Sequence, residues 1–139
     1  MFDRLEIRVL PRGPRWAAQV RFLVNGEDIV HGAVNGVVGE GGRGPFAQDA
    51  LPVDRPSPFR ATGEARRLFF GETACTAGCC GALSAVVQRT EGVVCWTDWE
   101  APRDETPPLD LHFLGTLYDA ELARAEADRS WRTDTTEQA

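Results

Sequence analysis

Hydrophobic and polar residues alternate along several short stretches of the chain, and this period of two predicts β-strands. The clearest of these stretches are residues 5–10, 16–24 and 27–30. Asn25-Gly26 separates the second stretch from the third, and this dipeptide favours a two-residue hairpin turn because both turn positions require positive φ. The first thirty residues therefore predict a strand followed by a hairpin.

Residues 82–89 and 93–100 predict a second hairpin, with Thr90-Glu91-Gly92 as a three-residue loop that has glycine in the left-handed conformation. In this hairpin we expect Arg89 to pair with Val93. The register places Leu83, Val87, Cys95 and Trp99 on one face, and Val86 and Trp96 on the other. Both faces then carry bulky apolar side chains, which indicates central strands rather than edge strands.

The remaining pattern adds two short strands and one helix. The strands are expected over residues 66–70 and 109–113. The helix is expected to begin with Thr116 as its N-cap and to end near Trp131. Its apolar stripe contains Tyr118, Leu122 and Ala125. Together these elements predict an α+β fold, mainly antiparallel β, with two hairpins in a small sandwich or barrel-like sheet and one C-terminal α-helix.

Residues 32–64 interrupt the alternating pattern because they are rich in glycine and proline. A connection of this length without regular structure is usually a lid, a binding loop or a disordered segment. A chain of 139 residues suits a single domain. We expect that domain to span residues 1–131, with residues 132–139 as a frayed tail.

The net charge of the chain limits which kinds of binding partner are expected. Acidic residues outnumber basic residues by 21 to 15, so the formal net charge is −6. A field of this sign repels phosphate backbones, and nucleic acid is therefore not an expected partner. Every basic residue is arginine, which excludes Schiff-base chemistry and a Walker A lysine.

The N-terminal residues lack the apolar segment of a signal peptide, and no run approaches the ~18 apolar residues of a membrane span. We therefore expect a cytoplasmic protein that does not bind a membrane. Thiols are kept reduced in the cytoplasm, so the four cysteines favour free, metal-bound or redox-active states over structural disulfides.

Three of the four cysteines cluster within six residues: Cys75, Cys79 and Cys80. With Cys95 they provide the number of thiolates that a structural zinc site needs. The spacing lacks a Cys-x2-Cys pair, and the expected register separates Cys80 from Cys95 by over ~20 Å along the hairpin. Cys95 is then expected to be a small apolar core residue. His31 or His112 would have to complete a zinc site from elsewhere in the chain.

The same cluster has two other interpretations. Cys75 with Cys79 or Cys80 spans a short loop that a disulfide can close, and a nearby cation would lower the pKa of such a redox thiol. Alternatively, Gly78 and Gly81 make a tight turn in which the thiols are buried structural groups. We favour the structural turn and keep the metal site and the redox pair as alternatives.

Three further patterns indicate structure more than chemistry. Residues 39–44 match G-x-G-x-x-G without a surrounding βαβ unit, which favours a flexible loop over a dinucleotide site. Acidic residues near the end of the second hairpin are expected to be solvated; they are Asp98, Glu100, Asp104 and Glu105. The tryptophans are expected in the core rather than in a ligand pocket; they are Trp16, Trp96, Trp99 and Trp131.

Three segments carry a family resemblance. They are Cys-Thr-x-Gly-Cys-Cys-Gly-Ala-Leu from residue 75, Val-Val-x-Trp-x-Asp-Trp from residue 93, and the Ala/Glu/Arg-rich helix of residues 118–131. Together they resemble a group of small, uncharacterised actinobacterial proteins. The resemblance covers roughly residues 66–131, implies a single domain and brings no activity with it.

These observations predict a small, acidic, cytoplasmic interaction or accessory protein, with a protein partner, no catalysis and no cofactor. One alternative is a metal-binding or thiol-redox protein that uses Cys75, Cys79 and Cys80, with zinc as the metal. A further alternative is a small-molecule enzyme in which residues 32–64 form a lid.

Overall fold

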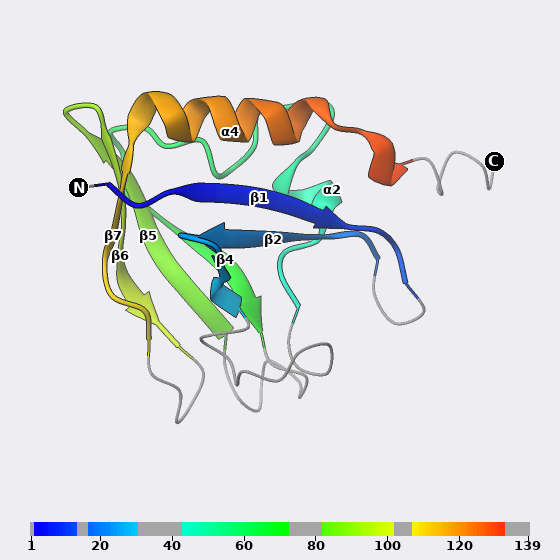
Figure 1. Cartoon of the computed structure of the whole chain (residues 1–139), viewed down its shortest axis with the longest axis horizontal. Helices are drawn as coiled ribbons and strands as arrows, with labels where there is room; N and C mark the ends of the chain where they lie inside the picture. Colours follow the sequence, from blue (N-terminus) through cyan, green and yellow to red (C-terminus); the bar gives the residue numbers. More distant parts are fainter. Residues whose placement is uncertain (1, 14–16, 31–42, 73–81, 102–106, 133–139) are drawn as a thin grey trace.

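The computed structural model describes residues 2–13, 17–30, 43–72, 82–101 and 107–132. The first of its two antiparallel sheets has the order β1-β2-β3, with β1 at Leu5–Leu10, β2 at Gln19–Val24 and β3 at Glu27–Asp28. The second has the order β4-β5-β6-β7, with strands at Arg66–Glu72, Ala82–Thr90, Val93–Glu100 and Leu111–Leu114. Helical elements are α2 at Ala47–Ala50, α4 at Gly115–Ala127 and the 3-10 turn η1 at Ser130–Arg132 (Figure 1). The expected α+β fold with a C-terminal helix is confirmed.

The first hairpin has the predicted turn. Asn25 and Gly26 have φ values of 53° and 91°, and the strands pair directly on either side of them. The return strand β3 ends at Asp28, two residues earlier than expected. The carboxylate of Asp28 accepts a hydrogen bond of 2.9 Å from the Val30 N–H, and this bond starts a helical turn in place of the strand.

The second hairpin differs from the prediction by one residue. Thr90, not Arg89, pairs with Val93, because Glu91 and Gly92 form a two-residue turn with φ values of 51° and 80°. A shift of one residue turns the side chains of one strand to the opposite face relative to its partner. The expected register is therefore wrong, and so are the expected sides of Cys95 and Trp96.

In the observed register Val87 faces Trp96, and both side chains lie in the core. Gln88 faces Cys95, which is half-buried on the opposite side of the sheet. Asp98 has a φ of 53° beside the irregularity at the end of this pairing, and beyond it Trp99 packs against the core. The two strands of this hairpin are nevertheless central in their sheet, as the sequence predicts.

Backbone bridges join the two sheets along two seams, so the arrangement resembles a barrel. At one seam, Asp3 pairs with Phe113 of β7 and its N–H donates to the His112 carbonyl at 2.8 Å. At the other, Arg43 and Glu72 exchange two backbone hydrogen bonds of 3.0 Å. Residues 43–46 thus connect β4 to β2, since they also bridge to Gln19.

Aromatic rings fill the space between the sheets. The ring centroid of Phe22 lies 4.7 Å from that of Phe59, 5.2 Å from Phe70 and 5.7 Å from Trp96. Edge-to-face and tilted contacts of this kind favour ordered packing over a loose apolar cluster. Phe59 lies within the segment expected to be a long unstructured connection, and Leu51 of the same segment is also buried. Residues 43–64 therefore supply part of the core.

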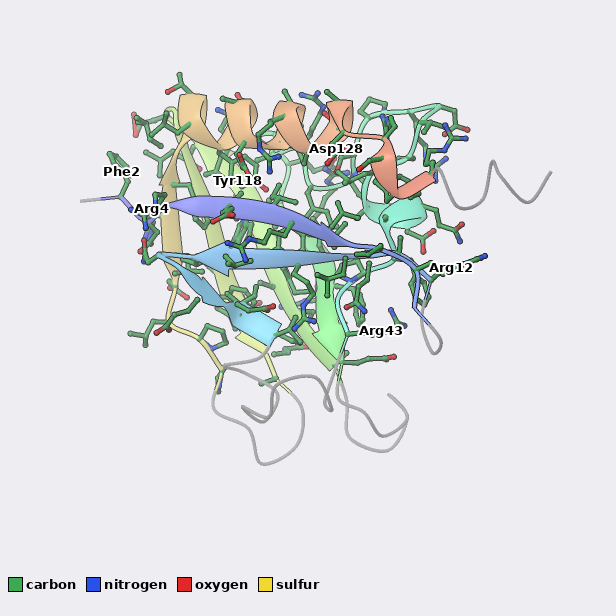
Figure 2. All side chains as sticks on the ribbon, turned by 45° about the vertical axis from the view of Figure 1, so that its right-hand side comes forward. Phe2, Arg4, Arg12, Arg43, Tyr118 and Asp128 are labelled. Carbon is green, nitrogen blue, oxygen red and sulfur yellow. The ribbon has the colours of Figure 1, made fainter. Side chains whose placement is uncertain are left out.

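Helix α4 lies along β1 and covers one end of the two sheets (Figure 1). The stripe expected to be apolar is buried, and its Tyr118 lies on the side of α4 that faces the strands (Figure 2). The Tyr118 hydroxyl also donates a hydrogen bond of 2.6 Å to the Phe59 carbonyl. The expected N-cap is wrong: the helix begins at Gly115, so Thr116 lies within it. It ends at Ala127 instead of Trp131. No helix of the described segments has the length and apolar character needed to cross a bilayer.

The start of α4 follows from contact with the second hairpin rather than from a capping side chain. The N–H of Gly115 donates to the Gly92 carbonyl at 2.8 Å. A Cβ atom at Gly115 would lie 2.6 Å from the same carbonyl oxygen, which leaves no room for another residue type. Close approach of two backbones therefore sets this end of the helix.

Candidate functional site

The cysteine cluster falls outside the described residues. Cys75, Cys79 and Cys80 lie between the end of β4 and the start of β5, as do Gly78 and Gly81. The residues that flank this segment are Glu72 and Ala82, and these two are register partners. The metal, redox and turn interpretations of the cluster all remain predictions.

Cys95 does not lie in the core, where the sequence predicts it. It is half-buried and absent from the core cluster, with Gln88 beside it on β5 and His112 beside it on β7. Burial raises the pKa of the Cys95 thiol, and the carboxylate of Asp110 raises it further. The thiol is therefore held in its protonated, unreactive form. Within the described segments no group of three or more His, Cys, Asp or Glu side chains is placed to hold a metal ion.

Cys95 belongs to a partly exposed apolar surface on the second sheet. Alternation along β5 buries Ala85 and Val87 and turns Val86 outward, and on β6 it buries Val94 and Trp96. We use the term outer sheet face for the outward apolar side chains of these strands and of β7. They are Val86, Val93, Cys95 and Leu114.

Carboxylates surround the outer sheet face. Asp98 and Glu100 lie at the far end of β6, with side chains 75% and 68% exposed. Asp110 precedes β7 near Cys95, and Glu91 lies at the β5–β6 turn. Among the described residues, the guanidinium of Arg67 pairs with these carboxylates; it lies 2.8 Å from that of Asp98 and 3.9 Å from that of Glu100. The surroundings of this face are therefore negatively charged.

A hollow of about 430 Å³ lies between β4 and residues 43–58. The guanidinium of Arg43 lies 4.1 Å from the ring centroid of Phe46 and 5.5 Å from that of Phe69. The same guanidinium pairs with Glu72 at 2.9 Å, so its charge is balanced. We refer to this space as the aromatic hollow. Its lining residues are Arg43, Pro45, Phe46, Asp49, Ala50, Pro58, Phe59, Leu68 and Phe69.

A second hollow, of about 610 Å³, shares Asp49 and Pro58 with the first. Its wall is held in place by Ser57, a buried hydroxyl that donates to the Ala50 carbonyl at 2.6 Å and accepts from the Phe59 N–H at 3.0 Å. We refer to this space as the arginine hollow. Its lining residues are Asp49, Arg55, Pro56, Ser57, Pro58, Arg60, Thr62, Glu64 and Arg66.

Several predicted site residues do not come together. Asp98 and Glu100 both approach Arg67, which fits solvated ion pairs, while Asp104 and Glu105 lie outside the described residues. His31, Trp16 and residues 39–42 of the glycine-rich pattern also lie outside them. His112 is exposed beside Cys95 on the outer sheet face. Trp96 is fully buried in the core, as expected.

Sequence reasoning did not find the two hollows. Their walls come from β4 and from residues 43–64, and the chain carries no motif that links these segments. The one available signal was the adjacent pair Arg66-Arg67. Strand alternation directs Arg66 to the arginine hollow and Arg67 toward Asp98, so the pair does not form a single basic patch.

Comparison of the chain with protein-family models, with curated proteins and with solved structures finds no match. Geometry and chemistry therefore carry the functional argument.

Proposed function

We propose that this protein is a small, non-catalytic interaction protein whose outer sheet face binds a basic protein partner. The observation that carries the proposal is the combination of half-buried apolar side chains with a surrounding group of carboxylates on one sheet. Protein interfaces commonly have an apolar centre and a polar, solvated rim. The four cysteines suit a compartment that keeps thiols reduced, so we also place its action in the cytoplasm.

The geometry of this surface suits docking better than catalysis. Strands β5 and β6 hold Val86 and Val93 in rigid, paired positions, so little conformational entropy is lost when a partner covers them. The carboxylates of Asp98, Glu100 and Asp110 attract basic proteins and reject acidic ones. The pKa of the Cys95 thiol is raised, which favours the inert thiol over a nucleophilic thiolate.

The experiment compares replacement of a valine by arginine on the outer sheet face with the same replacement at a site outside this face. Immobilised wild-type chain, Val86→Arg and Val93→Arg variants are used to capture proteins from extracts of the source cells. A protein that only the wild-type chain captures is then purified and titrated against all variants. We expect a basic partner whose affinity falls about tenfold or more with either substitution, because each adds a buried like charge.

Val53→Arg is the matched control, because Val53 is 52% exposed and lies outside the outer sheet face. This variant should bind the purified partner like the wild-type chain. Increasing salt should weaken the complex, since screening reduces the attraction of surface carboxylates. Equal affinity of all four chains, or an acidic partner, would contradict the proposal.

A metal-dependent or thiol-redox function predicts a different result when the clustered cysteines are replaced. If Cys75, Cys79 and Cys80 have no direct role, simultaneous replacement of the three by serine leaves the affinity for the purified partner unchanged in chains that remain folded. A folded triple variant that has lost the partner would favour the cysteine-based alternative. An enzyme in which residues 32–64 act as a lid would instead show ligand-dependent hydrogen exchange in that segment.

A further inference from the structure

We infer that the aromatic hollow and the arginine hollow together bind a small organic anion with an apolar body. The two hollows share Asp49 and Pro58 in their linings, so they are adjacent on the surface. One hollow is lined mainly by rings and prolines, and the other contains three guanidinium groups together with the carboxylates of Asp49 and Glu64. None of the residues that define the outer sheet face lines either hollow.

Arg66 is the central cation of this site. Its guanidinium is partly buried and donates hydrogen bonds to the carbonyls of Pro58 at 3.0 Å and Arg60 at 2.9 Å. Among the described residues no carboxylate lies within ion-pair distance of it. A fixed, partly desolvated cation without a counter-ion favours an anionic ligand, and arginine is well suited to carboxylate and phosphate groups.

The other two arginines of the arginine hollow have ion pairs of different exposure, since the side chain of Glu126, the partner of Arg60, is only 14% exposed. Arg60 pairs with Glu126 at 2.6 Å and its side chain is 46% exposed. Arg55 pairs with its neighbour Asp54, and both side chains are more than half exposed. A pair exposed on both sides contributes little to stability, so the Arg55 guanidinium can turn toward a ligand at small cost. The Arg60 guanidinium is expected to stay with the largely buried Glu126 carboxylate. The site therefore presents Arg66 and Arg55 to a ligand in a chain whose net charge is −6.

The aromatic hollow provides the space for the apolar body. A volume of about 430 Å³ is within the range of pockets that hold small organic molecules. Rings of Phe46 and Phe69 flank Arg43, whose charge is already balanced by Glu72. The anionic group is therefore expected at Arg66 rather than at Arg43. Asp49, at the junction, repels anions and limits affinity.

The test uses two probes with the same apolar body and opposite charge. Isothermal titration calorimetry of the full chain compares 1-naphthoate with the 1-naphthylmethylammonium cation. We expect the carboxylate to bind at least about tenfold more tightly, because a hydrogen-bonded charge pair forms only with the anion. Equal binding of the two probes, or tighter binding of the cation, would overturn the inference.

Two kinds of substitution, one expected to strengthen naphthoate binding and one expected to weaken it, test where the anion binds. Asp49→Asn should tighten naphthoate binding by about two- to fivefold, because it removes a repulsive charge beside the ligand. A gain of affinity cannot arise from loss of folding. Glu27→Gln removes the same charge at an exposed site away from both hollows and should have no effect. Unchanged affinity in Asp49→Asn would count against the site.

Arg66→Gln should weaken naphthoate binding about tenfold, whereas Arg12→Gln, an exposed arginine outside the hollows, should not. Because Arg66 also holds two carbonyls of the wall, Arg55→Gln serves as a second variant without such contacts and should weaken binding about two- to fivefold. If neither variant weakens binding, the arginine hollow is not the anion site.

Discussion

At the scale of single residues, Gly44 shows how little space the second seam between the sheets allows. Its N–H donates to the side-chain oxygen of Gln19 at 2.8 Å, and Gln19 is one of the few buried polar residues. A Cβ atom at Gly44 would collide with the carbonyl group of Val20. That carbonyl belongs to the backbone of β2 and cannot move aside as a flexible side chain can.

Gly44→Ala is therefore expected to lower the free energy of unfolding by about 2 kcal/mol or more, because β2 and residues 43–46 must separate to admit the methyl group. Urea denaturation at neutral pH measures this change. Gly63→Ala is the matched control, since no atom lies within 4 Å of a Cβ at Gly63 and its change should stay within about 0.5 kcal/mol. Similar midpoints for the two variants would refute the packing argument.

At the scale of elements, α4 protects the free edge of β1. The N–H of Ile7 donates to the carboxylate of Glu121 at 2.7 Å, and the Ile7 carbonyl accepts from the guanidinium of Arg124 at 2.6 Å. Glu121 and Arg124 also pair with each other at 2.6 Å. Two side chains thus satisfy the backbone groups that a neighbouring strand would otherwise bind, which protects the edge from intermolecular pairing.

Glu121→Ala leaves the Ile7 N–H without this acceptor, so we expect it to lower the free energy of unfolding by about 1–3 kcal/mol. Glu121→Gln keeps an acceptor oxygen and loses only the charge, so its effect should be smaller. Denaturation curves of the two variants measure the difference. Equal losses would show that the contact with Ile7 contributes nothing beyond the ion pair.

The same carboxylate makes stability depend on pH. Burial alone would raise the pKa of Glu121, but hydrogen bonds from Arg124 and from the Ile7 N–H outweigh it and lower the pKa below its usual value of 4.5. A lowered folded-state pKa contributes stability above the unfolded-state value, and this contribution is lost as the pH falls through the folded-state value. The wild-type chain should therefore lose more stability than Glu121→Gln between about pH 5 and pH 3.

At the scale of the whole molecule, the fold separates the acidic surroundings of the outer sheet face from the arginine hollow. The carboxylates around the outer sheet face lie on the β5–β7 side of the second sheet, and the arginine hollow lies between β4 and residues 49–64. Net charge alone suggests only a basic partner. The distribution of charge adds a local site for anions, so the two proposals concern different ligands and can fail independently.

The cysteine cluster is also tested on the whole molecule. We expect native mass spectrometry of protein purified without chelators or a metal-affinity column to give the metal-free mass, with four free thiols in a parallel assay. A stoichiometric excess of about 65 Da, lost together with the fold on chelation, would instead make Cys75, Cys79 and Cys80 zinc ligands. A mass about two units low would indicate a disulfide and favour the redox alternative.

Local sequence determined most of the elements. Alternation over residues 5–10 predicted β1, Asn25-Gly26 predicted the first turn, and the spacing of Tyr118, Leu122 and Ala125 predicted the buried side of α4. These features depend on backbone conformation and on periodicity, which neighbouring residues specify. Element ends were less predictable, because contacts distant in sequence set them, as Gly92 does for the start of α4.

Only the tertiary structure decided to which side of the second sheet the side chains of the second hairpin point and where the two hollows lie. The turn with positive φ at Glu91 differs from the expected loop by one residue, and the observed register places Trp96 on the same side as Val87 and Cys95 on the outer sheet face. The arrangement of Phe46 and Arg66 around neighbouring hollows depends on how residues 43–64 pack against β4. The sequence by itself therefore determined which strands and helix form, because those preferences are local. Register and cavities required the folded chain, because they arise from packing between residues far apart in sequence.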